Sequence, residues 1–112
     1  MRHDIDASLA DMLIAARRAV KRLGDTSESE FSEDTDLQWI LFSQLLILGE
    51  AANRIDRRDQ DELNQVPWSA MVGMRNRLVH GYDSIDWSVV YFTVRDQLPR
   101  LVELLESLVE LE

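Results

Sequence analysis

The sequence predicts an all-α fold, an antiparallel four-helix bundle whose last helix is kinked or split at Pro99. Apolar residues recur at helical spacing along most of the 112 residues, and only two prolines and four glycines interrupt them. The chain contains no repeat or low-complexity tract. A chain of this length suits one hydrophobic core, so residues 1–112 are expected to form a single domain.

The first helix is expected over residues 6–23, where the apolar residues lie on one stripe. These are Ile5, Leu9, Met12, Leu13, Ala16, Val20 and Leu23. Gly24 stands where a C-terminal cap belongs. The next segment, 25–34, is acidic and rich in Ser and Thr, so we expect an exposed connection with Phe31 as its anchor.

A second helix is expected over residues 35–55, and it is apolar on two faces. One stripe consists of Leu37, Leu41, Leu45, Leu48, Ala52 and Ile55, and the residues roughly opposite are Trp39, Phe42 and Leu46. Such a helix is either central or covered by another chain. Because two-fold dimers are the commonest assemblies, we expect a homodimer.

A charged loop is expected over residues 56–65, before the third helix. Pro67 suits the first turn of this helix, which runs to about His80 and is stopped by Gly81.

The last helix is expected to begin after Asp86, which serves as its N-cap, and to be interrupted by Pro99. Its first part carries Trp87, Val90, Tyr91, Val94 and Leu98. In the final amphipathic stretch, the residues facing inward are Leu101, Leu104, Leu105, Leu108 and Leu111, and those facing outward are Glu103, Glu106 and Glu110.

The chain is acidic, with a net charge of −9 and a pI near 4.6. This charge argues against wrapping duplex DNA, since Lys and Arg supply most of that affinity. The basic residues form three groups, which would make a local positive groove if they met in space: Arg17, Arg18, Lys21 and Arg22; Arg54, Arg57 and Arg58; Arg75 and Arg77. Solvated helix faces are the alternative interpretation.

Other classes of protein are excluded more simply. The chain has no cysteine, so disulfide and thiolate chemistry are excluded. Its longest apolar stretch, 39–48, is interrupted by polar residues and is far shorter than the roughly 20 residues that a bilayer requires. Asp4, Asp6 and Asp11 interrupt the amino terminus, so no signal peptide is expected. We expect no membrane association, and a cytoplasmic location is the default.

Residues 75–82 read Arg-Asn-Arg-Leu-Val-His-Gly-Tyr, and they hold the only histidine besides His3. On a helical wheel, Arg75 falls in the middle of the apolar face of the third helix. A guanidinium there needs a partner, and the best candidate is Glu50 on the second helix, among uncharged neighbours. Arg75 could then be purely structural.

His80 lies about 140° from Arg75 around the helix, so within one regular helix the two cannot grip one small group. Asn76 is one turn before His80 and could fix the orientation and tautomer of the imidazole. Gly73 occupies the same face and leaves room for something to approach the backbone. The alternative role for His80 is a favourable contact with the helix dipole.

The string Met-Arg-Asn-Arg-Leu-Val-His-Gly-Tyr at 74–82 resembles the HEPN superfamily, and within it the HepT-like toxins of prokaryotic toxin–antitoxin pairs. It is preceded by Pro67-Trp68 and followed by Asp86, as in that group. The likeness extends to three further segments and covers most of the chain: Gly49-Glu50-Ala51, Asp11-Met12-Leu13 and Asp96-Gln97-Leu98-Pro99.

The resemblance implies a dimeric helical bundle whose subunits form a shared cleft, a metal-independent endoribonuclease with no cofactor. Arg75, Asn76 and His80 match the catalytic positions of the family. Arg75 or Arg77 would bind the phosphate. Tyr82 matches a tyrosine that, in this family, a minimal nucleotidyltransferase antitoxin adenylylates to silence the toxin.

This chemistry is coherent with the residues present. Cutting RNA without a metal requires a base for the ribose 2′-hydroxyl, a cation for the charge on phosphorus, and an acid for the leaving 5′-oxygen. One histidine cannot easily perform both proton transfers. A two-fold dimer supplies two copies of His80 and of Arg75.

Two other interpretations remain open at this point. The first is a catalytically silent module that binds a nucleotidyltransferase partner or a nucleotide through the same cleft. The second and weaker one is a metal-dependent phosphodiesterase using His80, Asp83 and Asp86. Their spacings match no standard ligand set, and Asp86 is better used as an N-cap.

Overall fold

The computed structural model describes the backbone of residues 3–109 and the side chains of residues 5–109. The expected positions of Glu110 and Leu111 lie outside this range. In chain order, the elements are α1 (His3–Leu23), α2 (Glu28–Ser32), α3 (Thr35–Asn53), α4 (Arg57–Glu62), α5 (Trp68–His80), η1 (Tyr82–Ser84), α6 (Trp87–Phe92), η2 (Thr93–Gln97) and α7 (Leu98–Leu108). No strand occurs among residues 3–109, so the predicted all-α fold is confirmed.

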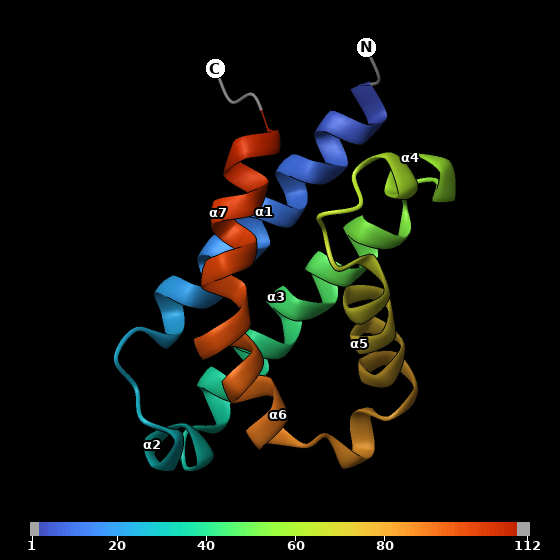
Figure 1. The fold of residues 1–112 in the computed structure, drawn as a ribbon. Helices are drawn as coiled ribbons and strands as arrows, with labels where there is room; N and C mark the ends of the chain where they lie inside the picture. The colour runs from blue at the N-terminus through green and yellow to red at the C-terminus, as the bar shows by residue number, and fades with distance from the viewer. Residues whose placement is uncertain (1–2, 110–112) are drawn as a thin grey trace.

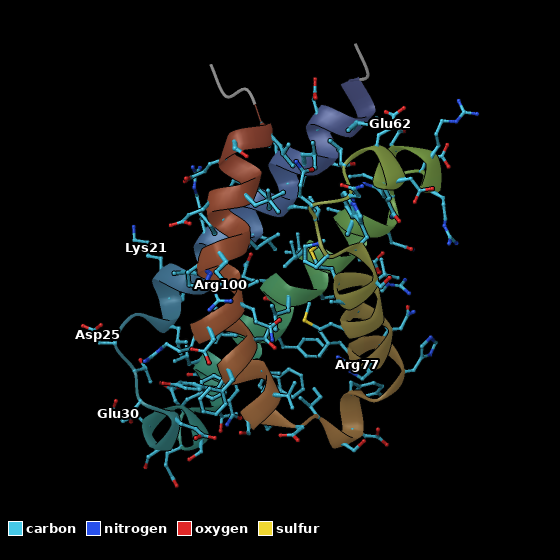
Figure 2. All side chains as sticks on the ribbon, viewed as in Figure 1. Lys21, Asp25, Glu30, Glu62, Arg77 and Arg100 are labelled. Carbon is cyan, nitrogen blue, oxygen red and sulfur yellow. The ribbon has the colours of Figure 1, made fainter. Side chains whose placement is uncertain are left out.

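The four long helices are α1, α3, α5 and α7, and neighbours run in opposite directions (Figure 1). The helix α1 packs against both α3 and α7, whereas α5 packs mainly against the far side of α3. The packing order is therefore α7, α1, α3, α5. Because α5 lies at the edge of the bundle, much of its surface faces solvent, and the sequence motif at its end is accessible (Figure 2).

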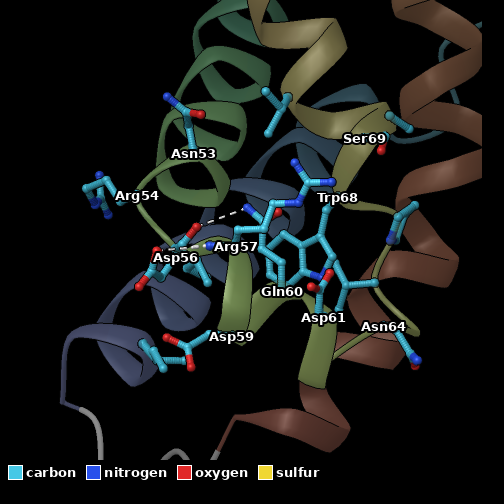
Figure 3. A pocket seen from close by; sticks show the side chains of 16 residues that line it. Asn53, Arg54, Asp56, Arg57, Asp59, Gln60, Asp61, Asn64, Trp68 and Ser69 are labelled. Atoms are coloured by element: carbon cyan, nitrogen blue, oxygen red, sulfur yellow. Dashed lines mark hydrogen bonds between the residues drawn. The ribbon is translucent and has the colours of Figure 1, made fainter.

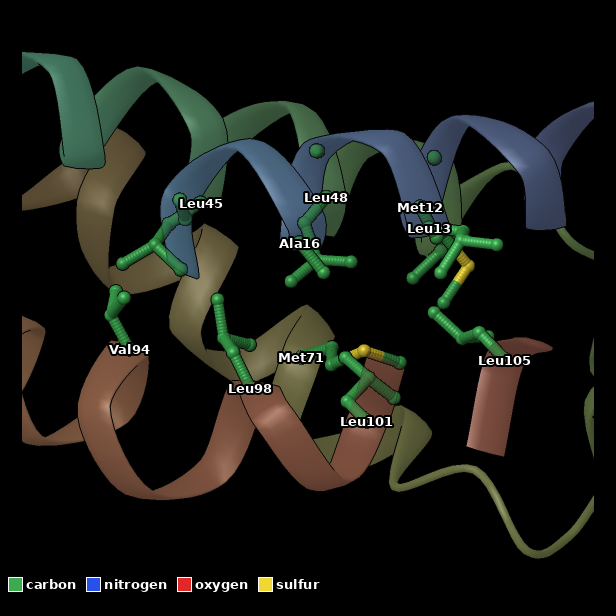
Figure 4. Packing of buried hydrophobic residues seen from close by; sticks show 14 of the residues in the cluster. Met12, Leu13, Ala16, Leu45, Leu48, Met71, Val94, Leu98, Leu101 and Leu105 are labelled. Carbon is green, nitrogen blue, oxygen red and sulfur yellow. The ribbon is translucent and has the colours of Figure 1, made fainter. Parts of the chain in front are cut away.

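The core is a continuous apolar cluster between these helices (Figure 4). It includes Met12, Leu13 and Ala16 of α1, Leu45 and Leu48 of α3, and Val94, Leu98, Leu101 and Leu105 of η2 and α7. All of these side chains are buried. The helical spacing that predicted them also determines which face of each helix turns inward.

The helix ends follow the predicted signals. Gly24 has a left-handed φ of 51° directly after α1, a conformation that favours glycine. The Asp86 carboxylate caps α6 by accepting from the backbone N–H groups of Ser88 (3.1 Å) and Val89 (3.3 Å). The second helix, α3, ends at Asn53, two residues earlier than expected.

The expected exposed connection (25–34) and charged loop (56–65) each contain a short helix that was not predicted. The expected exposure of 25–34 is confirmed for all its residues except Thr26 and Phe31. In 25–34, Ser27 and Glu30 form a reciprocal capping box that starts α2. In 56–65, Asp56 caps the N-terminus of α4. Local capping overrides the polar composition in both segments. The anchor role of Phe31 is confirmed, because its ring is buried against Tyr91 with centroids 5.6 Å apart.

The predicted interruption of the last helix lies in the turn before Pro99. The segment η2 is a π-helical turn that separates α6 from α7. A proline ring collides with the carbonyl four residues earlier, here that of Arg95, and offers no N–H to it. The wider π turn accommodates both defects.

Both faces of α3 are apolar, as the sequence predicted, but only one of them is fully buried. The stripe from Leu37 to Ile55 is buried against the bundle, whereas Trp39 is 45% exposed, and Phe42 and Leu46 are partly buried. The Trp39 ring contacts Trp87 of α6, with centroids 5.2 Å apart. The helix α3 is thus central and still presents apolar surface to solvent.

Candidate active site at the end of α5

The motif occupies the second half of α5 and the turn that follows. Trp68 fixes the start of the helix by donating its indole N–H to the Leu63 carbonyl at 2.9 Å. Pro67 lies immediately before the first turn, rather than within it as expected. Gly81 ends the helix and donates its N–H to the Arg77 carbonyl at 2.8 Å. Tyr82 begins the following 3₁₀ turn, η1.

The helices α3 and α5 approach each other closely at Gly49 and Arg75. A Cβ placed on Gly49 would lie 2.4 Å from the Cβ of Arg75 and 3.2 Å from the Met71 carbonyl oxygen. Real Cβ atoms essentially never come within 3.0 Å of another heavy atom, so the first of these contacts is not possible without a shift. Glycine is therefore required for this crossing, and the crossing brings the Arg75 side chain alongside Glu50.

The Arg75 guanidinium is held by two neighbours. Its Nε and Nη2 donate to Oε2 of Glu50 at 3.1 and 3.0 Å, and its Nη1 donates to Oδ1 of Asn76 at 2.9 Å. The predicted pairing of Arg75 with Glu50 is confirmed. The two side chains are 23% and 44% exposed, so the pair contributes little to stability, about 1 kcal/mol or less. Its main effect is to fix the direction of the guanidinium.

No hydrogen bond joins Asn76 to His80 among the described residues, and the Asn76 carbonyl oxygen accepts from Arg75. The imidazole of His80 is exposed and has no hydrogen-bond partner among residues 5–109. It is therefore free to meet a substrate or another chain. The phenol of Tyr82, two residues later, is also accessible, since this residue is 65% exposed.

Gly73 has the open space predicted for it. A Cβ there would meet only the Nη1 of Arg77, at 3.9 Å. The Arg77 side chain thus extends along the helix over Gly73, and it makes no ion pair within the described part of the chain. Arg77 is available for an anion, whereas Arg75 is already paired.

The three basic groups do not join into one groove. Arg17 pairs with Glu106 of α7 at 2.7 Å, and Arg54 pairs with Asp11 of α1 at 2.8 Å. Figure 2 shows Lys21 on the α1 and α7 side of the molecule, away from Arg77 on α5. The positive charge near the motif therefore comes from α5 itself.

Two cavities flank α5. One of 560 Å³ lies beside the motif, between α5 and α6, and its apolar lining consists of Leu45, Met74, Leu78, Ile85, Val89 and Val90. Arg77, His80 and Asp86 also line it. Sequence reasoning missed this cavity, although the spacing of Ile85, Val89 and Val90 around Asp86 marks a face of α6 that turns toward α5.

A wider cavity of 1190 Å³ lies at the opposite end of α5, around α4 (Figure 3). Its lining includes Asn53, Arg57, Gln60 and Ser69, and none of the predicted site residues. Figure 3 shows acidic and basic side chains mixed around it. Despite its size, this cavity has no link to the motif, so we place the site at the other end of the helix.

The structure does not bring His80, Asp83 and Asp86 together as metal ligands. Among the described residues, no group of three or more His, Asp or Glu side chains is arranged to hold a metal ion. Within the same part of the chain, no helix has the length and hydropathy needed to span a bilayer.

Comparisons with known proteins identify a family whose model covers most of the chain. The model of a family described as "Ribonuclease HepT-like" matches residues 12–108. A protein of Methanocaldococcus jannaschii named "Putative RNase MJ1380" is 30% identical over 100 residues, covering 89% of this chain and 92% of the relative. A protein of Thermococcus cleftensis named "Probable ribonuclease HepT" is 32% identical over 79 residues, covering 70% of this chain and 72% of the relative. No solved structure matches the chain significantly.

Proposed function

The chain belongs to the ribonuclease HepT-like family, and on this basis we propose that it is an endoribonuclease that cuts RNA without a metal, in a cleft shared by two copies. The observation that carries the proposal is the arrangement at the end of α5. Arg75 is fixed by Glu50 and Asn76, while His80 and Arg77 remain without partners among the described residues. The site therefore has one cation held in place, Arg75, and two groups that are free to meet a substrate: His80 for proton transfer and Arg77 as a second cation.

These groups suit cleavage through the ribose 2′-hydroxyl. A neutral His80 takes the 2′-hydroxyl proton, the 2′-oxygen bonds to phosphorus, and the bond to the 5′-oxygen breaks. A second, protonated histidine gives its proton to that leaving oxygen. The products are a 2′,3′-cyclic phosphate and a 5′-hydroxyl. Arg77 and Arg75 stabilise the charge that develops on the phosphoryl oxygens.

The need for a second histidine supports a homodimer. Arg75 faces α3, whereas His80 lies about 140° away around α5, so one chain cannot direct both at one phosphate. Exposed or partly exposed apolar residues flank the Arg75–Glu50 pair one turn away: Leu46 and Ile47 on α3, and Val79 on α5. We call this surface the α3–α5 strip. Burying it against a second copy would bring two sets of motif residues together.

In the wider proposal, the protein is the toxin of a toxin–antitoxin pair, and a nucleotidyltransferase antitoxin adenylylates Tyr82. The exposure of the Tyr82 side chain supports this, because a transferase must reach the phenol oxygen. An added AMP would bring bulk and negative charge beside Arg77 and His80, and would repel RNA.

Cleavage of a single-stranded RNA by the purified protein, with and without EDTA, tests the activity. His80→Ala should abolish cleavage, and its helical circular dichroism should match that of wild type because the side chain is exposed. Full cleavage by this variant would overturn the proposal. A wild type that binds a nucleotidyltransferase but cuts no RNA would favour the alternative, a silent module that uses the same surface.

Intact mass of the protein, expressed with and without a neighbouring nucleotidyltransferase, tests the modification. A gain of AMP mass that Tyr82→Phe prevents is expected. An unchanged mass, or a gain that persists in Tyr82→Phe, would contradict modification at this residue.

A further inference from the structure

We propose that the cavity between α5 and α6 is a nucleobase pocket that prefers bases with an exocyclic amino group, namely adenine, guanine and cytosine. The inference rests on the proposed ribonuclease function, because it assigns the pocket to a nucleotide next to the cut bond. The motif residues cannot supply such a preference. Arginine and histidine at a phosphate position the strand but read no sequence.

The size and lining of the cavity suit a flat aromatic ring. Its 560 Å³ lies within the roughly 300–1,000 Å³ typical of small-molecule sites. Side chains such as Leu78, Ile85 and Val90 make its walls apolar. Single-stranded RNA is commonly read in this way, with the base turned out of the strand, its faces against apolar groups and its edge hydrogen-bonded.

The position of the cavity ties it to the reaction. Arg77 and His80 line it, so a phosphate that meets these side chains carries its nucleoside directly to the opening. The cavity and the α3–α5 strip lie on different sides of α5. Five residues separate Met74 in the cavity from Val79 on the strip, which corresponds to about 140° around the helix. A second copy bound on the strip would leave the cavity open.

Asp86 supplies the hydrogen-bonding preference. Its Oδ1 accepts from the N–H groups of Ser88 and Val89 and caps α6. Its Oδ2 has no hydrogen-bond partner in the described part of the chain. A carboxylate oxygen only accepts, so it pairs with an amino group and repels a carbonyl. Uracil has no amino group and presents a carbonyl on each side of its single N–H, so it fits least well.

Asp86→Asn tests this assignment without removing the cap. Asparagine caps helices as well as aspartate does, and its carbonyl oxygen keeps the role of Oδ1. The NH₂ group then replaces Oδ2 and turns an acceptor into a donor. Asp83→Asn is the matched control, because it makes the same change in η1 at an exposed residue that does not line the cavity.

Methyl NMR titrations with 5′-AMP, 5′-GMP, 5′-CMP and 5′-UMP provide the readout. In wild type, the first three should shift the methyl signals of Ile85 and Val89 at concentrations roughly ten-fold lower than 5′-UMP requires. Asp86→Asn should remove this difference, and Asp83→Asn should keep it. Val89→Phe, at a half-exposed position, should fill the cavity and weaken all four.

Any of three results would overturn the proposed pocket. These are equal responses to the four nucleotides, an unchanged preference in Asp86→Asn, and shifts confined to the wider cavity around α4. The result is separable from the ribonuclease proposal. If wild type cuts no RNA but shows the preference, the pocket stands and the proposed reaction fails. If it cuts RNA with a base preference that Asp86→Asn does not change, the pocket fails alone.

Discussion

Gly49→Ala should loosen the site by separating α3 from α5. The added Cβ would lie 2.4 Å from the Cβ of Arg75 and 3.2 Å from the Met71 carbonyl oxygen. Carbon atoms prefer separations of about 3.5–4.0 Å, so the helices must part by about 1 Å at this crossing. Neither contacted atom can rotate away, because one is a Cβ and the other belongs to the backbone.

Two opposing contributions determine how much Gly49→Ala changes the free energy of unfolding. Overpacking a buried contact costs about 1–3 kcal/mol, and replacing a mid-helix glycine with alanine returns about 1 kcal/mol. We expect a net loss of up to about 2 kcal/mol in the free energy of unfolding. The effect on activity should be larger, because a displacement of about 1 Å of a positioned group can cost roughly a hundred-fold in rate.

Gly73→Ala is the matched control for stability. The same substitution on α5 meets only the Nη1 of Arg77, at 3.9 Å, so it should raise the free energy of unfolding by about 0.4–1 kcal/mol. Urea unfolding followed by circular dichroism, together with RNA cleavage rates, measures both variants. If Gly49→Ala is as stable as Gly73→Ala, or retains wild-type cleavage, the close crossing does not position Arg75.

Three further predictions test separate parts of the molecule. Glu50→Gln should cost less than about 1 kcal/mol in urea unfolding but lower the cleavage rate roughly ten-fold, and a loss of stability without a loss of rate would make the pair structural only. Ile47→Glu should convert a dimer into a folded monomer in sedimentation velocity experiments and stop cleavage, whereas an unchanged mass would exclude the α3–α5 strip as the interface. The N–H and hydroxyl of Ser27 hold the pKa of Glu30 below 4.5, so the capping box contributes stability above pH 4.5 that is lost as pH falls through the lowered pKa. The Ser27 amide signal in NMR should titrate with a midpoint below 4.5 and stop titrating in Glu30→Gln; a midpoint at or above 4.5 would contradict the box.

The long helices were predictable because one periodic apolar stripe is repeated over many turns. The stripe from Leu37 to Ile55 can be recognised without knowing which helices pack against it. The short helices α2 and α4 were not predicted, because a segment of five or six mostly polar residues gives no usable period. The signals that mark them are local, such as the spacing of Ser27 and Glu30.

The site was predictable only in part. An inward arginine and a lone carboxylate on the neighbouring helix were enough to pair Arg75 with Glu50. Helical spacing also placed Asn76 beside His80, but it could not show that the Asn76 carbonyl oxygen accepts from Arg75. The cavity beside His80 depends on where α6 lies relative to α5, which is a tertiary property absent from any single helix.

One part of the site depends on the packing of two helices and the other part does not, so the two parts should respond differently to mutation. Arg75 is placed by the packing of α3 on α5 at Gly49, so changes that disturb this contact should alter stability and activity together. His80, Arg77 and Tyr82 lie at the exposed end of α5 and in η1, where no core contact depends on their side chains. Their substitution should change activity or modification while leaving stability nearly constant. A variant series that shows this division would locate the functional surface even before any substrate is known, because a purely structural motif would lose stability at every position.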